Sequence, residues 1–155
     1  MHTENVIVMH APVEVVYALA AAVERWPELL PHYRWVTILQ EHASHRLVEM
    51  AASRDGVPLQ WRAEQRCDPV THCITFRHVR GVTTGMDVEW RFLPQPDGVQ
   101  VSISHDLRLR WPLIGGLVAD LIVGPLFVEN IANKTLRRIK VIAEAQAISS
   151  TSQRW

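Results

Sequence analysis

Two histidines occupy positions where acid–base chemistry inside a protein is possible. His78 and His105 fall on the apolar-facing positions of predicted strands, and these strands flank the one that carries Met86 and Trp90. The ordinary pKa of histidine lies nearest to neutral pH among the side chains, so an inward histidine can take up or release a proton. The commoner explanation of each is a buried neutral ring with one nitrogen hydrogen-bonded. His78 and His105 are therefore the proton-transfer candidates, with purely structural burial as the alternative.

Other reactive residue types indicate little further chemistry. His42, His45 and His72 lie near turns and lack the spacing of metal ligands. Cys67 and Cys73 are the only cysteines, and strand alternation places one inward and the other outward, so we expect two free thiols. We predict that the protein has no metal and no cofactor.

Three segments alternate between apolar and polar residues, as strands with one buried face do. Their inward positions are Leu59, Trp61, Ala63, Gln65 and Cys67; Met86, Val88, Trp90 and Phe92; and Val99, Val101, Ile103, His105, Leu107 and Leu109. The positions between them carry mostly charged and polar side chains. The predicted sheet therefore has one apolar face that another element must cover.

Helical periodicity predicts the elements around this sheet. We expect a short strand over 5–9, a helix over 11–23, a second short helix through Leu30, and about six antiparallel strands from Tyr33 onward. A long amphipathic helix over 117–147 covers the sheet, with a kink or break at Gly124-Pro125. The predicted fold class is α+β: a curved antiparallel sheet wrapped around a long C-terminal helix.

Composition and charge narrow the classes of partner. The chain has 155 residues, 48% of them hydrophobic, and 16 Lys+Arg balance 16 Asp+Glu. We expect one domain over 1–148 and a polar tail over 149–155. Zero net charge disfavours nucleic acid and anionic membranes as partners. The first residues do not resemble a signal peptide, and the most apolar stretch, 113–128, is too short to span a membrane, so we expect a cytoplasmic protein.

Several sequence features resemble those of a known superfamily. They are the opening Ala11-Pro12-Val13-Glu14-Val15-Val16-Tyr17, Trp26-Pro27 after the first helix, Gly85-Met86 followed by Trp90, and the amphipathic C-terminal helix. Together they resemble the START-related helix-grip (SRPBCC) superfamily, and within it the polyketide cyclase/dehydrase branch of aromatase/cyclases. The resemblance covers 5–147. It implies an internal cavity, between the sheet and the long helix, that takes an apolar or aromatic small molecule.

The resemblance also indicates which residues form the site. The aromatic-lined tunnel of aromatase/cyclases is matched by Trp26, Tyr33, Trp61, Met86 and Trp90. With neighbouring inward positions, the predicted ligand-binding residues are Trp26, Leu30, Tyr33, Trp61, Gln65, Met86, Val88, Trp90 and Ile103. The predicted catalytic residues are Tyr33, His78 and His105. On the long helix, either Asn130 or Asn133 is a candidate to face the cavity.

One feature of the aromatase/cyclases is not matched. They place an arginine inside the pocket, on the strand of the first inward Trp, whereas Arg62 and Arg66 here alternate outward and no glycine indicates a bulge that would turn them in. Two functions therefore stay open. The first is an enzyme that cyclises and dehydrates a poly-β-ketone, for which an acyl carrier protein is the candidate donor. The second is a carrier that shelters a lipid or quinone without chemistry, and a module that docks another macromolecule on its outer surface is a weaker third.

Overall fold

The described part of the chain forms one sheet, one long helix and three short helical segments. The computed structural model describes residues 2–54, 56–107 and 125–152. The strands are β1 (His2–Met9), β2 (Tyr33–His42), β3 (His45–Arg54), β4 (Val57–Asp68), β5 (Cys73–Gly81), β6 (Asp87–Gln95) and β7 (Gly98–Asp106). The helical segments are α1 (Val13–Ala21), the 3-10 turn η1 (Val23–Arg25), α2 (Trp26–Leu29) and α4 (Pro125–Ser152).

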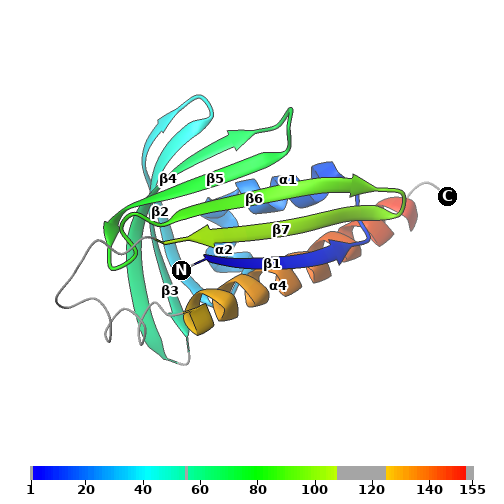
Figure 1. Ribbon diagram of the computed structural model, residues 1–155. Coiled ribbons are helices and arrows are strands. Elements are labelled where there is room, and N and C mark those ends of the chain that lie inside the picture. Colours follow the sequence, from blue (N-terminus) through cyan, green and yellow to red (C-terminus); the bar gives the residue numbers. More distant parts are fainter. Residues whose placement is uncertain (1, 55, 108–124, 153–155) are drawn as a thin grey trace.

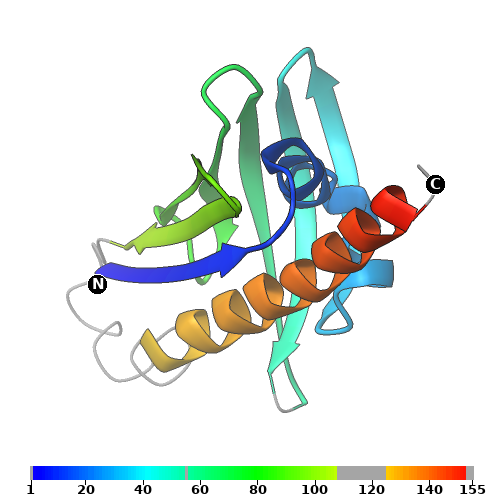
Figure 2. The same ribbon diagram turned by 90° about the vertical axis from the view of Figure 1, so that its right-hand side faces the viewer.

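The seven strands form a single antiparallel sheet in the order β1-β7-β6-β5-β4-β3-β2. Consecutive strands from β2 to β7 are neighbours, so the only distant pairing brings β1 to the edge beside β7. Figure 1 shows the sheet in front of the helices, and Figure 2 shows α4 lying along its curved inner face. This arrangement confirms the predicted α+β helix-grip fold.

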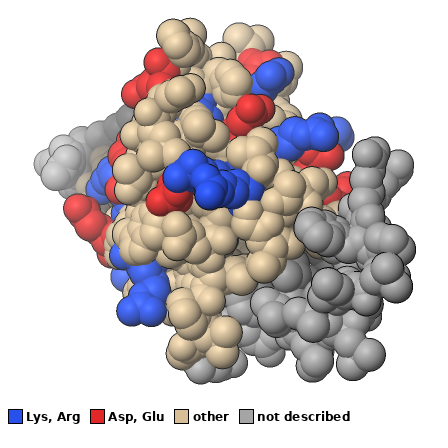
Figure 3. All heavy atoms as spheres, turned by 90° about the vertical axis from the view of Figure 1, so that its left-hand side faces the viewer, with Lys and Arg blue, Asp and Glu red and all other residues tan. Residues whose placement is uncertain are grey.

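The alternation read from the sequence explains which face of the sheet is buried. Along β4, Trp61, Ala63 and Gln65 are buried, while the residues between them are partly or fully exposed. The same period holds in β6 and β7. On the molecular face shown in Figure 3, acidic and basic side chains are interspersed, in keeping with the balanced charge of the chain.

Helix α4 supplies the cover that the apolar face requires. Its buried residues are Val128, Ala132, Thr135, Leu136, Ile139 and Ala143. Two hydrogen bonds join it to the end of β1: Lys140 Nζ donates to the Val8 carbonyl at 2.9 Å, and the His10 amide donates to Glu144 Oε1 at 3.0 Å. No helix in the described part of the chain is long and apolar enough to cross a membrane.

Several predicted boundaries differ from the structure. β1 begins at His2 rather than at residue 5, because β7 continues far enough to pair with it. The first helix ends at Ala21 instead of residue 23, because the backbone of Ala22 is not helical and has a ψ of 64°. α4 continues past residue 147 to Ser152, since no Gly or Pro follows to stop it. The kink predicted at Gly124-Pro125 lies at the edge of the described residues, where α4 starts.

A β-bulge that the sequence did not predict lies in β5. Arg62 pairs with Arg80 and the next residue, Ala63, pairs with His78, so Val79 is the extra residue. The bulge resets the alternation of β5 and leaves Arg80 exposed, although strict period two would turn it to the same face as His78. The alternation of β4 itself is uninterrupted, so Arg62 and Arg66 face outward as predicted.

Candidate functional site

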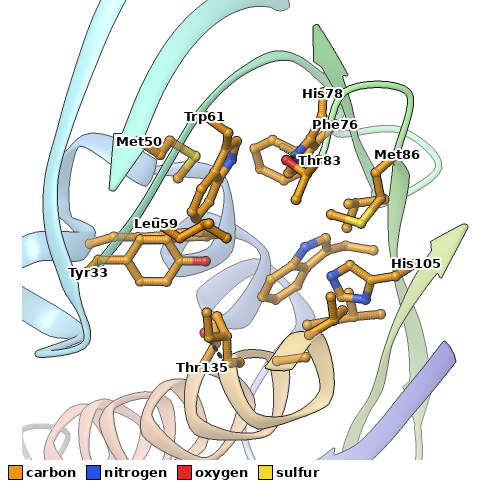
Figure 4. Close-up of a pocket in the computed structure, with 17 residues that line it drawn as sticks. Tyr33, Met50, Leu59, Trp61, Phe76, His78, Thr83, Met86, His105 and Thr135 are labelled. Atoms are coloured by element: carbon orange, nitrogen blue, oxygen red, sulfur yellow. Dashed lines mark hydrogen bonds between the residues drawn. The ribbon is translucent and has the colours of Figure 1, made fainter. Parts of the chain in front are cut away.

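A cavity lies between the inner face of the sheet and α4. Its walls come from α2, from β2 to β7 and from α4 (Figure 4). Its volume is about 70 Å³, which is well below the roughly 300–1,000 Å³ of pockets for drug-sized ligands. A polycyclic ligand therefore fits only if wall side chains move. Met50 and Met86 are the wall residues with the most adaptable side chains.

Most residues predicted from the sequence do meet at this cavity. Those that line it are Trp26, Tyr33, Trp61, His78, Met86, Val88, Trp90, Ile103 and His105. Leu30 and Gln65, also predicted as ligand-binding residues, are fully buried and lie outside the lining. The amide of Gln65 is used structurally: its Nε2 donates to the Ala21 carbonyl, and its Oε1 accepts from Arg46 Nε, both at 3.0 Å.

Aromatic rings in mutual contact form one wall. Trp26 lies edge-on to Tyr33 with ring centroids 4.9 Å apart, and on its other side it meets Trp90 at 5.9 Å. Trp26 Nε1 donates to the Leu19 carbonyl at 3.2 Å, which anchors the indole to α1. Because Pro27 directly follows it in the first turn of α2, the backbone that carries Trp26 is itself constrained.

His78 is held on two sides at one end of the cavity. Its ring stacks on Trp61, with centroids 5.5 Å and planes 6° apart, and its Nδ1 lies 2.6 Å from Thr83 Oγ1. Thr83 belongs to the loop between β5 and β6, which folds back so that the His78 amide donates to the Met86 carbonyl. Gly81 permits this loop: its φ is +107°, and a Cβ there would lie 2.8 Å from the Gln60 carbonyl oxygen.

His105 reaches the cavity from β7, on the side nearer to α4. Figure 4 shows its ring with one nitrogen toward the cavity and the other toward α4. Nδ1 is buried and has no hydrogen-bond partner among the described residues. His105 thus brings a polar atom into an apolar environment without the pairing that His78 has.

Both histidines are neutral at physiological pH. Burial, together with a smaller repulsion from His105, lowers the pKa of His78 to about 3. Burial also lowers the pKa of His105 to about 4, although the neighbouring Asp106 opposes this shift. The two rings can therefore accept hydrogen bonds or a transient proton, but a proton on one disfavours a proton on the other.

Tyr33 and Thr135 form a second polar group at the other end of the cavity (Figure 4). Burial raises the pKa of Tyr33 above its ordinary value, and a hydrogen bond with Thr135 offsets only part of this, so the phenol keeps its proton. Thr135 Oγ1 donates to the Ile131 carbonyl and lies 2.8 Å from His32 Nε2, which must then donate to it. Burial, with Lys134 nearby, lowers the pKa of His32 to about 4.

Thr135, rather than an asparagine, is the polar residue that α4 contributes. Neither Asn130 nor Asn133 lines the cavity, and Asn133 instead accepts a hydrogen bond from Asn5 Nδ2 at 3.0 Å. The lining residues not predicted as site residues are Met50, Leu59, Phe76, Thr83, Val128, Ile131, Ala132 and Thr135. Strand alternation in β4 could have predicted Leu59, and the helical spacing of apolar residues could have predicted those on α4. Thr83 lies in a loop, where no periodicity applies.

No arginine of residues 2–54, 56–107 and 125–152 lines the cavity. Arg62 points to the other side of the sheet, where its Nε lies 2.5 Å from Glu49 Oε2. The described residues also contain no group of three His, Cys, Asp or Glu able to hold a metal ion. Cys67 and Cys73 are free thiols, as predicted, and they pair with Ile74 and Asp68 across the β4–β5 ladder. The polar side chains that line the cavity among the described residues are the imidazoles of His78 and His105, the hydroxyls of Tyr33, Thr83 and Thr135, and the indoles of Trp26, Trp61 and Trp90.

Comparison with known proteins gives consistent matches. A family model described as polyketide cyclase/dehydrase and lipid transport matches residues 9–125. The granaticin polyketide synthase bifunctional cyclase/dehydratase of Streptomyces violaceoruber is 34% identical over 106 residues. That match covers 66% of this chain and only 33% of the relative, so the chain spans about a third of the relative's length.

Solved structures share the fold. The Zhui aromatase/cyclase of Streptomyces sp. R1128 aligns with a TM-score of 0.79 and 23% identity over 93% of both chains. A START superfamily protein of Mycobacterium smegmatis aligns with a TM-score of 0.67 and 16% identity, covering 96% of this chain and 97% of the other. At these identities the likeness concerns the fold.

Proposed function

Because the chain belongs to the polyketide cyclase/dehydrase and lipid transport family, we propose that it folds, cyclises and dehydrates a poly-β-ketone in its cavity. One observation supports this most: an apolar aromatic middle separates two groups of uncharged polar side chains. Tyr33 and Thr135 form one group, and His78, Thr83 and His105 form the other. A chain of alternating carbonyls and methylenes has oxygen atoms that both groups can bind, and its bent middle packs against the rings.

The chemistry needs only proton transfers. A neutral imidazole, His105 or His78, removes a proton from a methylene flanked by two carbonyls, and such protons are already acidic enough for a weak base. The resulting enolate carbon bonds to a ketone carbon within the same chain, whose oxygen takes the proton back from the imidazolium and becomes a hydroxyl. The neutral imidazole then removes a second C–H proton next to the new hydroxyl and returns it to that hydroxyl, which leaves as water while a carbon–carbon double bond forms. No oxidant or reductant is consumed.

The polar side chains fit two roles in these reaction steps: donating a hydrogen bond to the ketone oxygen, and returning a proton to the departing hydroxyl. Tyr33 keeps its proton, so it donates a hydrogen bond to the ketone oxygen that gains charge. The lowered pKa of His105 makes its protonated form a strong acid, which favours return of the proton to the departing hydroxyl. The aromatic wall contributes orientation, because two carbons held in contact react faster than the same carbons in a flexible chain.

Variants of the two groups test this function. His105→Gln and Tyr33→Phe should lower kcat for cyclisation about 10²-fold or more, the ordinary size of a general acid–base contribution. Quenching of tryptophan fluorescence by the bound substrate should show nearly unchanged affinity. His42→Gln is the matched control, since His42 is exposed at the end of β2. Wild-type kcat in both site variants would contradict the assigned roles.

A carrier function is the second candidate, and it is favoured because no arginine lines the cavity in the part of the chain that the structure describes. In that case the protein shelters an apolar molecule, such as a lipid or quinone, and performs no chemistry. Mass spectrometry of small molecules that copurify with the protein distinguishes the two. A retained lipid or quinone, with no turnover of any poly-β-ketone, supports the carrier function.

Delivery of the substrate by an acyl carrier protein belongs to the same proposal. A groove of about 570 Å³ lies outside the cavity, lined by Pro31, His32, Ser53, Lys134, Arg137, Arg138 and Val141. Its lining includes three cations and no carboxylate, and the His32–Thr135 hydrogen bond separates it from the cavity. A negatively charged carrier would be attracted to it. Lys134→Glu with Arg137→Glu should weaken turnover of carrier-bound substrate while leaving turnover of the free substrate unchanged.

A further inference from the structure

Four polar side chains with unpaired buried atoms lie on β1, on β7 and at the beginning of α4. The atoms are Thr3 Oγ1, Asn5 Oδ1, His105 Nδ1 and Asn130 Oδ1, and none has a hydrogen-bond partner among the described residues. Thr3 and Asn5 are only 5% and 9% exposed. Buried polar atoms in folded proteins almost always have a partner, so such a concentration calls for a physical explanation.

Strand register and helix contacts place these residues together. Thr3 pairs directly with His105 across the β1–β7 ladder, and Asn5 follows two residues later on the same buried face. Asn5 Nδ2 donates to Asn133 Oδ1 at 3.0 Å. This bond places Asn133 of α4 beside Asn5 of β1. Asn130 lies one turn earlier on α4, on the side toward Thr3. Figure 2 shows β1 and the first turns of α4 side by side.

No hydrogen bond joins any two of these four atoms in the described part of the chain. The free atoms of Asn5 and Asn130 are carbonyl oxygens, which only accept hydrogen bonds. Each needs a donor, and the Thr3 hydroxyl and His105 Nδ1 offer at most one proton each. None of Thr3, Asn5 and Asn130 lines the cavity, so an apolar ligand there cannot reach them directly.

We propose that this cluster is a buried water-binding site. A water molecule donates one proton to Asn5 Oδ1 and the other to Asn130 Oδ1, and its oxygen accepts from His105 Nδ1–H, with the Thr3 hydroxyl completing the shell. Buried waters ordinarily make about three such bonds to groups that are otherwise unpaired. Water is the occupant that fits, because it supplies two donors and an acceptor from one small molecule.

The water site determines the tautomer of His105. Since both protons of the water point at asparagine oxygens, Nδ1 must carry the imidazole proton and donate it. Nε2 is then left with a free lone pair, on the nitrogen that faces the cavity in Figure 4. This step rests on the proposed function, because a lone pair directed into the cavity is what a general base requires. Asn5, Asn130 and Thr3 act as positioning residues that never touch the substrate.

Nitrogen-15 NMR of the imidazole rings tests the proposal without substrate. In the ligand-free wild-type protein at pH 7, His105 should be almost entirely the Nδ1–H tautomer. Asn130→Leu and Thr3→Val should shift it toward Nε2–H, whereas Thr37→Val, at an exposed position of β2, should not. An Nε2–H tautomer in the wild type would overturn the proposal, as would no shift in either variant.

A second measurement on the wild type covers the case in which the variants fail to fold. Water-selective nuclear Overhauser experiments should show a long-lived water next to the Thr3 methyl and the Asn130 side chain. Absence of such a water would overturn the proposal. Neither experiment depends on turnover. A protein with this water and tautomer but no cyclase activity would refute the proposed function alone, while an active protein with Nε2–H His105 would refute only the water site.

Discussion

The imidazole of His78 stacks on the indole of Trp61, with ring centroids 5.5 Å apart and planes only 6° from parallel. Trp61 lies on β4 opposite Gly81, and His78 pairs with Ala63, two residues after Trp61 on the same buried face of the sheet. Thr83 binds the ring from the loop that follows. The contact joins a binding wall and a proton-transfer candidate in one rigid unit, so perturbing one should affect the other.

The Thr83 hydroxyl is predicted to stabilise the fold by fixing His78. Thr83→Val should lower the free energy of unfolding by about 1–3 kcal/mol, because it leaves a buried imidazole nitrogen without a partner. Urea denaturation measures this. Thr37→Val is the control, and at its exposed position we expect a change within about 0.5 kcal/mol. Equal effects of the two substitutions would show that the bond contributes nothing.

Stability should fall as the solution is acidified below about pH 6.5. The pKa of His78 is lowered to about 3 and that of His105 to about 4, so between these values and the unfolded pKa of 6.5 the unfolded chain binds more protons. Each histidine therefore adds stability that is complete above pH 6.5 and is lost toward pH 3–4, with a slope of at most about 1.4 kcal/mol per pH unit.

Urea midpoints at pH 7, 6 and 5 measure this slope. The variant with both His78→Gln and His105→Gln should lose less stability per pH unit than the wild type, although His32 still contributes in both. Identical slopes would mean that neither ring is buried in its neutral form.

Ligand binding should enlarge the cavity by moving methionines. Since the cavity holds only about 70 Å³, a three-ring aromatic must displace Met50 and Met86. Their methyl resonances, observed in protein with 13C-labelled methionine, should shift on titration with such a ligand. Met9 is the internal control, because it is fully buried but not part of the cavity. Binding that leaves both wall methionines unshifted would place the ligand elsewhere.

Both cysteines are predicted to be slow to react in the folded protein. Burial raises the pKa of Cys67 and of Cys73, so little thiolate forms near neutral pH. A thiol reagent should detect two free thiols at once in denaturant and react far more slowly without it. Rapid reaction of the native protein, or fewer than two thiols in the unreduced denatured chain, would contradict the structure.

The sequence predicted the elements that obey a period and missed those that do not. Inward residues of β4, β6 and β7, including Trp61 and Trp90, followed from strand alternation, and the buried side of α4 followed from helical spacing. The bulge at Val79 has no glycine to mark it. Thr83 reaches His78 only because the loop folds back, which is a tertiary event.

Predictions about single polar residues were less successful. Gln65 lies on the buried face of β4, as its position in the strand predicts, but its side-chain amide already bonds Arg46 and the Ala21 carbonyl. The helical phase of α4 did not distinguish Asn130 from Asn133. Asn133 lies toward β1, where it accepts a hydrogen bond from Asn5. Phase gives the face of an element, whereas the partner of a polar atom depends on where distant segments meet.

The product distribution of a poly-β-ketone tests the central claim most directly. Such a chain cyclises slowly on its own to several ring isomers, because any of its acidic methylenes can attack. With stoichiometric protein, chromatography with mass detection should show one dehydrated ring isomer dominating, and Tyr33→Phe or His105→Gln should return the mixture toward the spontaneous pattern. The same isomers in the same ratio with and without wild-type protein would contradict the proposed cyclase function.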